Sequence, residues 1–453
     1  MTNHRDPVER WLSRDIELLP PPQGTFRRVR RRARQRKAVQ AASVAAGVAV
    51  LVAAGAALPR LASNRTQGTA KVGTSPPGHA TRGTAKPASR TPRPSASGPL
   101  LPLSSAGSGQ RPPTSFRPSS VTFIQRGALG AVIGQGGRSC GPAPCTLVAG
   151  TRNYGAHWTE IGAPPAGPPA GASGVSQIRF ADARDGWAFG PQLYATHDGG
   201  KRWTKVTSVG APVVDLSAVS GRVFAVGATG CKGSGSRHAA GCTTFTLYAA
   251  STTGRTWQTV TDGTGQVTPG GLQLTASNGY LLAGSRLWSG SLGGAWRPVV
   301  ISPATPATPP CLTNAAQRGL IAPTPASSAQ AGTLYLACGL TAGQPSGVYA
   351  SGDGGHTWQA RGTRGLPASA IATSLAVSPA GQLVLATTAG IYVSTADART
   401  WRRAAVHQQV TGGFGFVGMT TATKGVAVPV DSGLHEVFIT RDGGSSWRRS
   451  VIR

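Results

Sequence analysis

The chain has 453 residues, enough for one large domain or for two or three ordinary ones. Its 63 glycines and 35 prolines exceed a fifth of all residues, which favours turns and linkers and argues against a protein built of long helices. The chain carries 45 Lys and Arg against 15 Asp and Glu, and the resulting net charge of +30 favours anionic partners.

The first 37 residues are predicted to lie in the cytoplasm. Asp6-Pro7 is typical of a helix start, and apolar residues then recur at roughly helical spacing over residues 7–19. We expect a short amphipathic helix there, suited either to a membrane surface or to a partner protein. Residues 27–37 carry eight positive charges, which by the positive-inside rule keeps the N-terminus on the cytoplasmic side.

The stretch 38–58 contains no charged residue and consists mainly of Ala and Val. As a helix it would be about 31 Å long, enough to cross a hydrocarbon core of about 30 Å. We therefore predict a single transmembrane helix that anchors the protein in the cell membrane. A cleaved signal peptide is the alternative, but the 37 residues before the apolar run are many for a signal peptide.

Residues 59–118 are rich in Ser, Thr, Pro, Gly and Ala and contain very few bulky apolar side chains. Such a segment cannot bury enough apolar surface to offset the entropy lost on folding, so we expect a disordered linker. It would act as a stalk between the membrane and an extracytoplasmic domain formed by residues 119–453.

That domain contains a sequence repeat. Seven eight-residue segments each end in Trp and are called Trp motifs 1 to 7 below. In order they are TRNYGAHW (151–158), THDGGKRW (196–203), ASTTGRTW (250–257), SGSLGGAW (289–296), SGDGGHTW (351–358), STADARTW (394–401) and TRDGGSSW (440–447). Successive motif tryptophans are 39 to 62 residues apart, a spacing that fits four short strands per repeat.

The consensus, Ser/Thr-x-Asp-x-Gly-x-Thr-Trp, resembles the Asp-box (BNR) repeat of sialidases, xyloglucanases, sortilin-type receptors and photosystem II assembly-factor propellers. The resemblance covers residues 119–453 and implies an all-β fold, a seven-bladed β-propeller. The third position is Asp in motifs 2, 5 and 7 and Asn in motif 1, whereas motifs 3, 4 and 6 have neither residue there. Similarity to the assembly-factor propellers alone would imply a luminal assembly factor, but the basic segment and the stalk are not part of that pattern.

Each Trp motif is predicted to form the turn between the third and fourth strands of a blade. The Asp accepts backbone N–H bonds within the turn, the Gly at the fifth position permits positive φ, and the Trp begins the outer strand. We assign these residues structural rather than catalytic roles. They are Asn153, Trp158, Asp198, Trp203, Trp257, Trp296, Asp353, Trp358, Trp401, Asp442 and Trp447.

Strand counting predicts that each blade comes from one continuous stretch of chain. The first and last blades would then meet through side-chain packing alone, unless residues 112–118 join them.

The six cysteines are even in number and fall into three sequence-local pairs. No CxxC pair and no His at metal-ligand spacing occurs, so we expect neither a zinc site nor any other metal or cofactor. Disulfides formed in an oxidising compartment explain the pattern. The predicted pairs are Cys140–Cys145, Cys231–Cys242 and Cys311–Cys338.

Catalysis finds little support in the sequence. The sialidases of the Asp-box class use an Arg triad, a Tyr nucleophile and an early Arg-Ile-Pro motif, which is not found here. Glycosidases that use two carboxylates need the pair about 5–9.5 Å apart, and the repeat region has few acidic residues. Asp215, on a predicted inner strand, is the single weak catalytic candidate. A glycoside hydrolase, sialidase-like or xyloglucanase-like, is therefore the alternative function.

The favoured function is a non-catalytic binding or scaffold module. Residues 119–453 carry 25 basic and 11 acidic groups, so we expect long-range attraction to an anionic cell-envelope polymer, or binding to a protein partner. An Arg-rich surface inherited from an Arg-rich proteome is the alternative explanation of this charge. No nucleic acid is expected as a partner. The outer-strand residues Arg402, Arg403, Arg448 and Arg449 follow motif tryptophans and are expected on the rim.

Overall fold

The computed structural model describes residues 110–453 except for 125–127, 137–144, 168–171, 220, 232–241, 326–327, 329–330, 340–346, 368–369, 395–396 and 432. The predicted basic segment (1–37), the transmembrane helix (38–58) and residues 59–109 of the predicted stalk lie outside the described residues. No helix within the described part has both the length and the apolar character needed to span a membrane.

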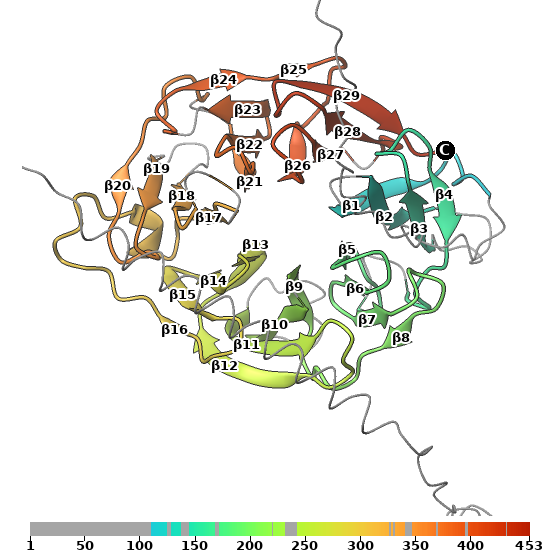
Figure 1. Ribbon diagram of the computed structural model, residues 1–453, viewed down its shortest axis with the longest axis horizontal. Helices are drawn as coiled ribbons and strands as arrows, with labels where there is room; N and C mark the ends of the chain where they lie inside the picture. The colour runs from blue at the N-terminus through green and yellow to red at the C-terminus, as the bar shows by residue number, and fades with distance from the viewer. Residues whose placement is uncertain are drawn as a thin grey trace, which may run out of the picture. The chain divides into compact units, whose positions relative to one another are not determined.

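The described residues form a ring of seven antiparallel sheets, which confirms the all-β, seven-bladed β-propeller predicted from the sequence (Figure 1). Blades 1 to 3 are β1 (Arg117–Ile124), β2 (Leu129–Gln135), β3 (Thr146–Thr151) and β4 (Thr159–Ile161); β5 (Gln177–Phe180), β6 (Gly186–Phe189), β7 (Leu193–Thr196) and β8 (Thr204–Lys205); β9 (Val213–Val219), β10 (Arg222–Cys231), β11 (Cys242–Ser251) and β12 (Gln258–Thr264).

The remaining four blades follow in chain order. Blades 4 and 5 are β13 (Val267–Leu274), β14 (Asn278–Ala283), β15 (Arg286–Ser291) and β16 (Arg297–Pro298); β17 (Gly319–Pro323), β18 (Leu334–Cys338), β19 (Gly347–Ser351) and β20 (Gln359–Ala360). Blades 6 and 7 are β21 (Ala372–Val377), β22 (Leu383–Thr387), β23 (Gly390–Ser394) and β24 (Trp401–Arg403); β26 (Phe414–Met419), β27 (Gly425–Pro429), β28 (Glu436–Thr440) and β29 (Ser446–Val451).

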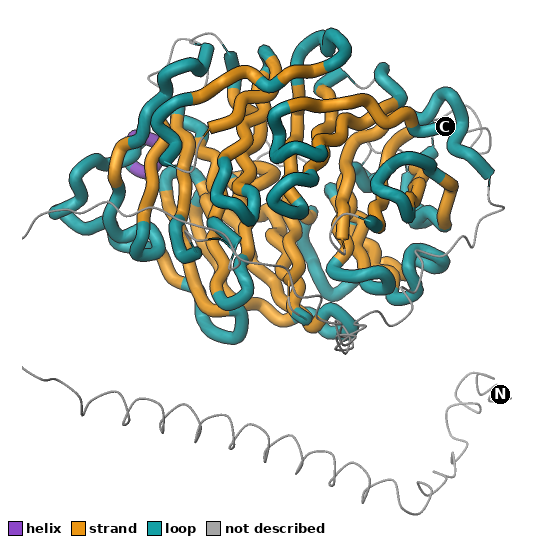
Figure 2. Tube along the Cα trace, turned by 45° about the horizontal axis from the view of Figure 1, so that its top comes forward, coloured by secondary structure: helices purple, strands orange, loops and turns teal. Residues whose placement is uncertain are grey.

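Each blade is one continuous stretch whose first strand faces the centre of the ring and whose last strand lies at the rim (Figure 1). Blade 7 has an additional edge strand, because β25 (Ala405–Val406) pairs in parallel with β29. Figure 2 shows the strands standing side by side around the ring, with one helical turn, η2 (Pro310–Leu312), before blade 5.

The core lies between neighbouring blades rather than within any one of them. The central strands carry most of the buried residues; β22 and β28, for example, are buried at every position. Because a four-stranded sheet is apolar on both faces here, each blade covers the next, and the buried residues divide into seven clusters around the ring. A closed ring therefore leaves no apolar sheet face open to water.

The ring begins before residue 119, the predicted start of the domain. Strand β1 begins at Arg117, the side chain of Phe116 is fully buried, and the backbone N–H of Glu160 donates to Gln110 O at 2.9 Å. Residues 110–118, which we assigned to the disordered linker, thus pack against the first and last blades. Phe116 is one of the few bulky apolar residues of that segment, and its burial in the cluster of Trp158 and Ile452 accounts for the difference.

Two of the predicted disulfides are present. Cys231 and Cys242 are directly paired across β10 and β11, and Cys311 in η2 is bonded to Cys338 at the end of β18. Cys145 is also disulfide-bonded, whereas Cys140 lies outside the described residues.

Candidate functional site

Each Trp motif with Asp at the third position forms the same type of hydrogen-bonded turn. In motif 5, Ser351 Oγ donates to Asp353 Oδ1 at 2.8 Å and accepts from the N–H of Gly355, while Asp353 Oδ1 accepts from the N–H of Thr357 at 2.9 Å. Partial burial raises the pKa of Asp353, but hydrogen bonds from Thr357 and Ser351 outweigh this effect and lower the pKa to about 2. The carboxylate is thus committed to holding its turn.

The same set of bonds recurs in motifs 1, 2 and 7. Asn153 Oδ1 and the carboxylates of Asp198 and Asp442 each accept the hydroxyl two residues earlier and an N–H four residues later. The fifth-position glycines of motifs 1, 2, 5 and 7 have φ between 73° and 100°, the region that penalises a side chain. In motif 6 Ala398 takes this conformation, with φ 53°.

Motifs 3 and 4 close differently. The N–H of Gly254 donates to Ser251 O, and the N–H of Gly294 donates to Ser291 O, so each forms an ordinary β-turn. Motif 3 begins with Ala250, which has no hydroxyl to offer the turn. Neither fifth-position glycine has a positive φ there, in contrast to the sequence prediction.

All seven motif tryptophans are buried in the ring. The indole N–H of Trp358 and of Trp447 donates within its own turn, to Gly355 O and Gly444 O. Those of Trp203 and Trp401 donate to Gly162 O and Gly362 O, in the segment that leads out of the preceding blade. Buried Trp296 Nε1 has no hydrogen-bond partner among the described residues.

Asp215 lies on inner strand β9 as predicted, but its carboxylate is buried, with 2% exposure. Its Oδ1 accepts from its neighbour Leu216 N at 2.9 Å, and its Oδ2 accepts from Leu272 N on β13 at 2.8 Å. Burial raises the pKa of Asp215 to about 6, against the lowering effect of the Leu272 hydrogen bond and of the Arg179 charge. Because both oxygens accept backbone N–H groups, this carboxylate links blades 3 and 4.

Blades 1 and 7 meet at the closure seam, where the chain does not continue from one blade to the next. Tyr154 reaches across it, and its hydroxyl lies 2.8 Å from Gly425 O and 2.7 Å from Thr440 O. Ser450 on β29 accepts the indole N–H of Trp158 at 2.9 Å and donates to Gly155 O. The closure is therefore held by buried hydrogen bonds as well as by side-chain packing.

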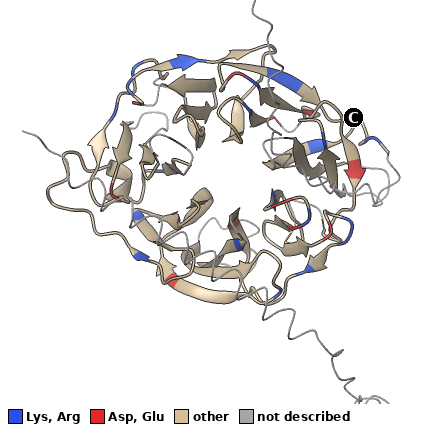
Figure 3. Cartoon of the chain, viewed as in Figure 1, with Lys and Arg blue, Asp and Glu red and all other residues tan. Residues whose placement is uncertain are grey.

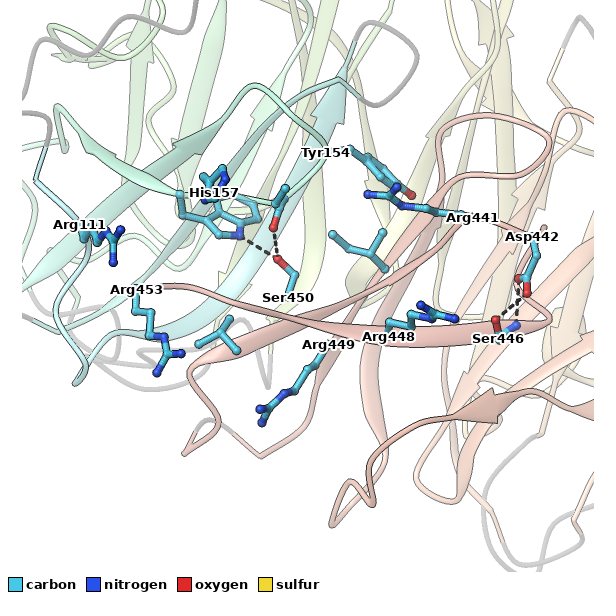
Figure 4. A pocket seen from close by; sticks show the side chains of 15 residues that line it. Arg111, Tyr154, His157, Arg441, Asp442, Ser446, Arg448, Arg449, Ser450 and Arg453 are labelled. Atoms are coloured by element: carbon cyan, nitrogen blue, oxygen red, sulfur yellow. Dashed lines mark hydrogen bonds between the residues drawn. The ribbon is translucent and has the colours of Figure 1, made fainter.

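A cleft of about 830 Å³ opens at this seam (Figure 4). Its walls come from the turn of motif 1, the turn of motif 7, strand β29 and the two ends of the ring. Five exposed arginines line it: Arg111, Arg441, Arg448, Arg449 and Arg453. We call this the seam cleft. His157 and Tyr154 complete its polar lining.

The seam cleft contains one carboxylate among the described residues that line it, that of Asp442. Partial burial raises its pKa, but hydrogen bonds from Ser446 and Thr440 outweigh this and hold the pKa below its usual value. Those bonds occupy the carboxylate inside its turn, and the two from Ser446 are the dashed lines beside Asp442 in Figure 4. Arg449 also pairs with Glu436 on β28, whose Oε2 lies 3.8 Å from its Nη1. Guanidinium groups therefore outnumber carboxylates around the cleft, and this excess of positive charge favours an anion there.

The four rim arginines predicted from the sequence are all exposed, and the blue segments on β24 and β29 in Figure 3 mark them. They belong to two different surfaces. Arg448 and Arg449 line the seam cleft, whereas Arg402 donates to Ser445 Oγ at 2.6 Å and Arg403 donates to Ala389 O at 3.0 Å.

Sequence reasoning missed Arg111, Arg441 and Arg453 as members of one site. The available signal was the ring closure itself, because closure brings motif 1, motif 7 and both ends of the repeat region together. In the described part of the chain, no group of three or more His, Cys, Asp and Glu side chains is placed to hold a metal ion.

No protein-family model matches this sequence, and no curated protein matches it. Solved structures do match. YCF48 from Cyanidioschyzon merolae is 14% identical, with a TM-score of 0.49 over 73% of this chain and 96% of its own. YCF48 bound to D1 peptide is 17% identical, with a TM-score of 0.44 over 74% of this chain and 93% of that one.

An ancestral GH74 enzyme is also similar, at 14% identity and a TM-score of 0.48 over 75% of this chain and 47% of its own. Both a peptide-bound protein and an enzyme thus stand among the similar structures, and a shared fold does not decide between such roles. By its own strand order and site, the chain is a seven-bladed β-propeller with a basic cleft at its closure seam.

Proposed function

We propose that this protein is a non-catalytic binding module that holds an anionic cell-envelope polymer in the seam cleft. The observation that carries the proposal is the set of five exposed arginines around one cleft, where Asp442, the one acidic side chain among the described lining residues, is engaged in its own turn and only Arg449 has an acidic neighbour, Glu436. Guanidinium groups donate in a fixed fork that matches carboxylate and phosphate oxygens. A phosphate- or uronate-bearing polymer, with one anion per repeating unit, suits a cleft lined in this way.

The electrostatics also predict how binding responds to salt. The repeat region carries an excess of 14 positive charges, which attracts a polyanion over distances of the order of the Debye length, about 8–10 Å at physiological salt. Contacts in the seam cleft then fix the bound segment. Affinity should fall steeply as salt rises, because most of these guanidinium groups are open to solvent.

The test compares two matched pairs of arginines. Arg448 and Arg449 follow Trp447 on β29, and Arg402 and Arg403 follow Trp401 on β24 in the same way. We expect Arg448→Ala/Arg449→Ala to weaken binding of polygalacturonate or poly(glycerol phosphate) by roughly tenfold or more, as loss of charge-assisted hydrogen bonds requires. Arg402→Ala/Arg403→Ala removes the same charge outside the cleft and should change affinity by much less.

Equal losses in the two double variants would show that overall charge, and not the seam cleft, binds the polymer. Binding that does not respond to salt would rule out the electrostatic mechanism. The glycoside hydrolase alternative is tested in parallel: turnover of xyloglucan or a sialoside that disappears in Asp215→Asn would overturn the non-catalytic proposal.

We also propose that the protein is an Asp-box (BNR) propeller and that a transmembrane helix anchors it in the cell membrane. An Asp-box (BNR) propeller is supported by the four motif turns with a hydroxyl and an Asp or Asn at matching positions. An extracytoplasmic location is supported by the two disulfides and by the eight positive charges before the apolar run 38–58. Protease added to intact cells should digest the propeller and spare an N-terminal tag; release of the propeller into the medium would contradict the anchor.

A further inference from the structure

A second cavity lies at one mouth of the central channel, away from the seam cleft. It has a volume of about 480 Å³ and is lined where the inner strands begin, by Ser119 on β1, Gln177 on β5 and Thr373 on β21. In an antiparallel blade the third strand ends at the face opposite the start of the first, so the Trp motif turns lie on the other face of the ring. We call this cavity the channel mouth.

Arg179 on β5 is the central polar group of the channel mouth. Its Nη1 donates to Ser120 Oγ at 3.1 Å and to Ile178 O at 2.8 Å, and its guanidinium carbon lies 5.4 Å from the ring centre of Phe416. Burial lowers the pKa of Arg179 and the Asp215 charge raises it, but an arginine stays protonated in proteins. Among the described residues, its Nε and Nη2 atoms have no hydrogen-bond partner, so one edge of a fixed guanidinium remains available.

Arg318, which precedes β17, supplies a second guanidinium to the same cavity and is exposed. No carboxylate is among the described residues that line the channel mouth; Asp215 is buried behind it, with backbone N–H groups on both oxygens. Hydroxyls complete the polar lining, and Pro118, Pro269 and Phe416 form apolar walls. Such walls strengthen charge-assisted hydrogen bonds because they limit the access of water.

We propose that the channel mouth binds a phosphate group, either free or as a small phosphate monoester. The group carries a charge of about −1.5 to −2 at neutral pH and several acceptor oxygens, which matches two guanidinium groups better than a singly charged carboxylate does. The free edge of Arg179 binds one pair of oxygens, and Arg318 neutralises the remaining charge. The cavity has the size of ordinary small-molecule sites. The proposal does not depend on the polymer bound in the seam cleft.

The test is calorimetric titration of the complete chain, purified in mild detergent in a phosphate-free buffer at physiological salt. Methyl phosphate and inorganic phosphate are the probes, and acetate is the singly charged comparison. We expect one saturable phosphate site with acetate at least about tenfold weaker, and about a tenfold or greater loss in Arg318→Ala. Arg179→Gln should cause a similar loss. Tighter binding of methyl phosphate than of inorganic phosphate identifies an ester as the ligand, and the reverse order identifies the free ion.

Arg318 is exposed and makes no side-chain hydrogen bond in the described part of the chain, so its variant keeps the test valid even if Arg179→Gln fails to fold. Arg402→Ala/Arg403→Ala, which removes the same charge outside both the seam cleft and the channel mouth, should leave methyl phosphate binding unchanged, whereas Arg448→Ala/Arg449→Ala, the seam variant, reports phosphate bound in the seam cleft. The proposal is overturned if no saturable binding occurs, if acetate binds as tightly, or if the seam variant loses binding while Arg318→Ala retains it. Failure of polymer binding in the seam cleft has no bearing on these outcomes.

Discussion

Two junctions between blades of this ring are held by different chemistry. Blades 3 and 4 follow each other in the chain and are linked through one buried carboxylate, where Asp215 on β9 accepts the N–H of Leu272 on β13. Blades 7 and 1 have no chain connection between them, and the buried hydrogen bonds between them join neutral groups. There Tyr154 reaches two carbonyl oxygens of blade 7, and Ser450 joins Trp158 to Gly155.

The difference shows what a ring needs at its closure. A junction that the chain itself crosses keeps its register even when one side-chain bond is lost. The closure seam must specify register through side chains alone, and it does so with several directional hydrogen bonds beside the cluster of Phe116, Trp158 and Ile452. The chain ends that create this seam also bring the arginines of the seam cleft together, so closure and site share the same residues.

The largest expected difference between the two junctions is in their response to pH. Asp215 has a pKa of about 6 in the folded state against 3.8 ordinarily, so the folded state binds its proton more tightly. Its contribution to stability is therefore full below about pH 4 and lost as pH rises through 6, by about 3 kcal/mol in total. Urea unfolding of the complete chain at pH 4.5 and 7.5 measures most of this loss.

Asp215→Asn is the control, because it cannot ionise, and the pH-dependent part of the free energy of unfolding should shrink in it. Other buried acids, such as Glu436, whose pKa burial also raises, contribute in the same direction and are cancelled by the comparison. If the pH dependence were unchanged in Asp215→Asn, another group would be responsible for it. The ionisation of Asp215 would then not control the stability of the junction between blades 3 and 4.

At the closure seam we expect Tyr154→Phe to lower the free energy of unfolding by about 2 kcal/mol, because it removes the buried hydroxyl whose one hydrogen is shared between Gly425 O and Thr440 O. Tyr280→Phe is the matched control: Tyr280 is buried in blade 4, and its hydroxyl makes no hydrogen bond within the described residues. It should cost well under 1 kcal/mol. Equal effects would mean that the Tyr154 hydroxyl does not hold the seam.

The indole groups give a smaller contrast between the same junctions. Trp158 donates to Ser450 at the seam, whereas buried Trp296, in the cluster between blades 3 and 4, has no partner for its N–H among the described residues. Trp158→Phe and Trp296→Phe remove similar volumes, so the seam variant should be the more destabilised by about 1 kcal/mol. Thermal unfolding of the two variants decides this, and a larger loss for Trp296→Phe would refute it.

The architecture was predictable because each blade repeats the same local signal. A motif with a hydroxyl, an Asp, a Gly and a Trp specifies its turn from within eight residues, as Asp198 and Asp353 illustrate. Where the signal weakens, as at Ala250 in motif 3, the turn differs while the strands remain. Strand pairing and burial between blades therefore determine the fold, and the motif adds local precision.

The seam cleft was only partly predictable. Arg448 and Arg449 were identified as rim residues from their place after Trp447, but nothing local distinguishes them from Arg402 and Arg403. Their grouping with Arg111 depends on which ends of the chain meet when the ring closes. Likewise, the position of Asp215 on an inner strand was expected, but its bond to Leu272 in the next blade is a contact between distant residues that no spacing in the sequence indicates.

The smallest expected effect on stability tests whether the turns of the Trp motifs act independently of the closure seam. Asp353 in blade 5 and Asp442 in blade 7 make the same bonds, each accepting a hydroxyl two residues earlier and a backbone N–H and a hydroxyl four residues later. Asp353→Ala and Asp442→Ala should therefore each cost about 1 kcal/mol, as loss of a side-chain cap on exposed backbone does.

Equality of these two costs is the informative result. The turn of motif 7 borders the seam cleft and that of motif 5 does not, so a turn that acts only within its own blade predicts no difference between them. Chemical unfolding at pH 7 measures both, well above the pKa of about 2 at Asp353, so both carboxylates are ionised. A distinctly larger cost for Asp442→Ala would show that motif 7 also stabilises the ring closure, and the seam would then extend from its buried bonds out to the edge of the cleft.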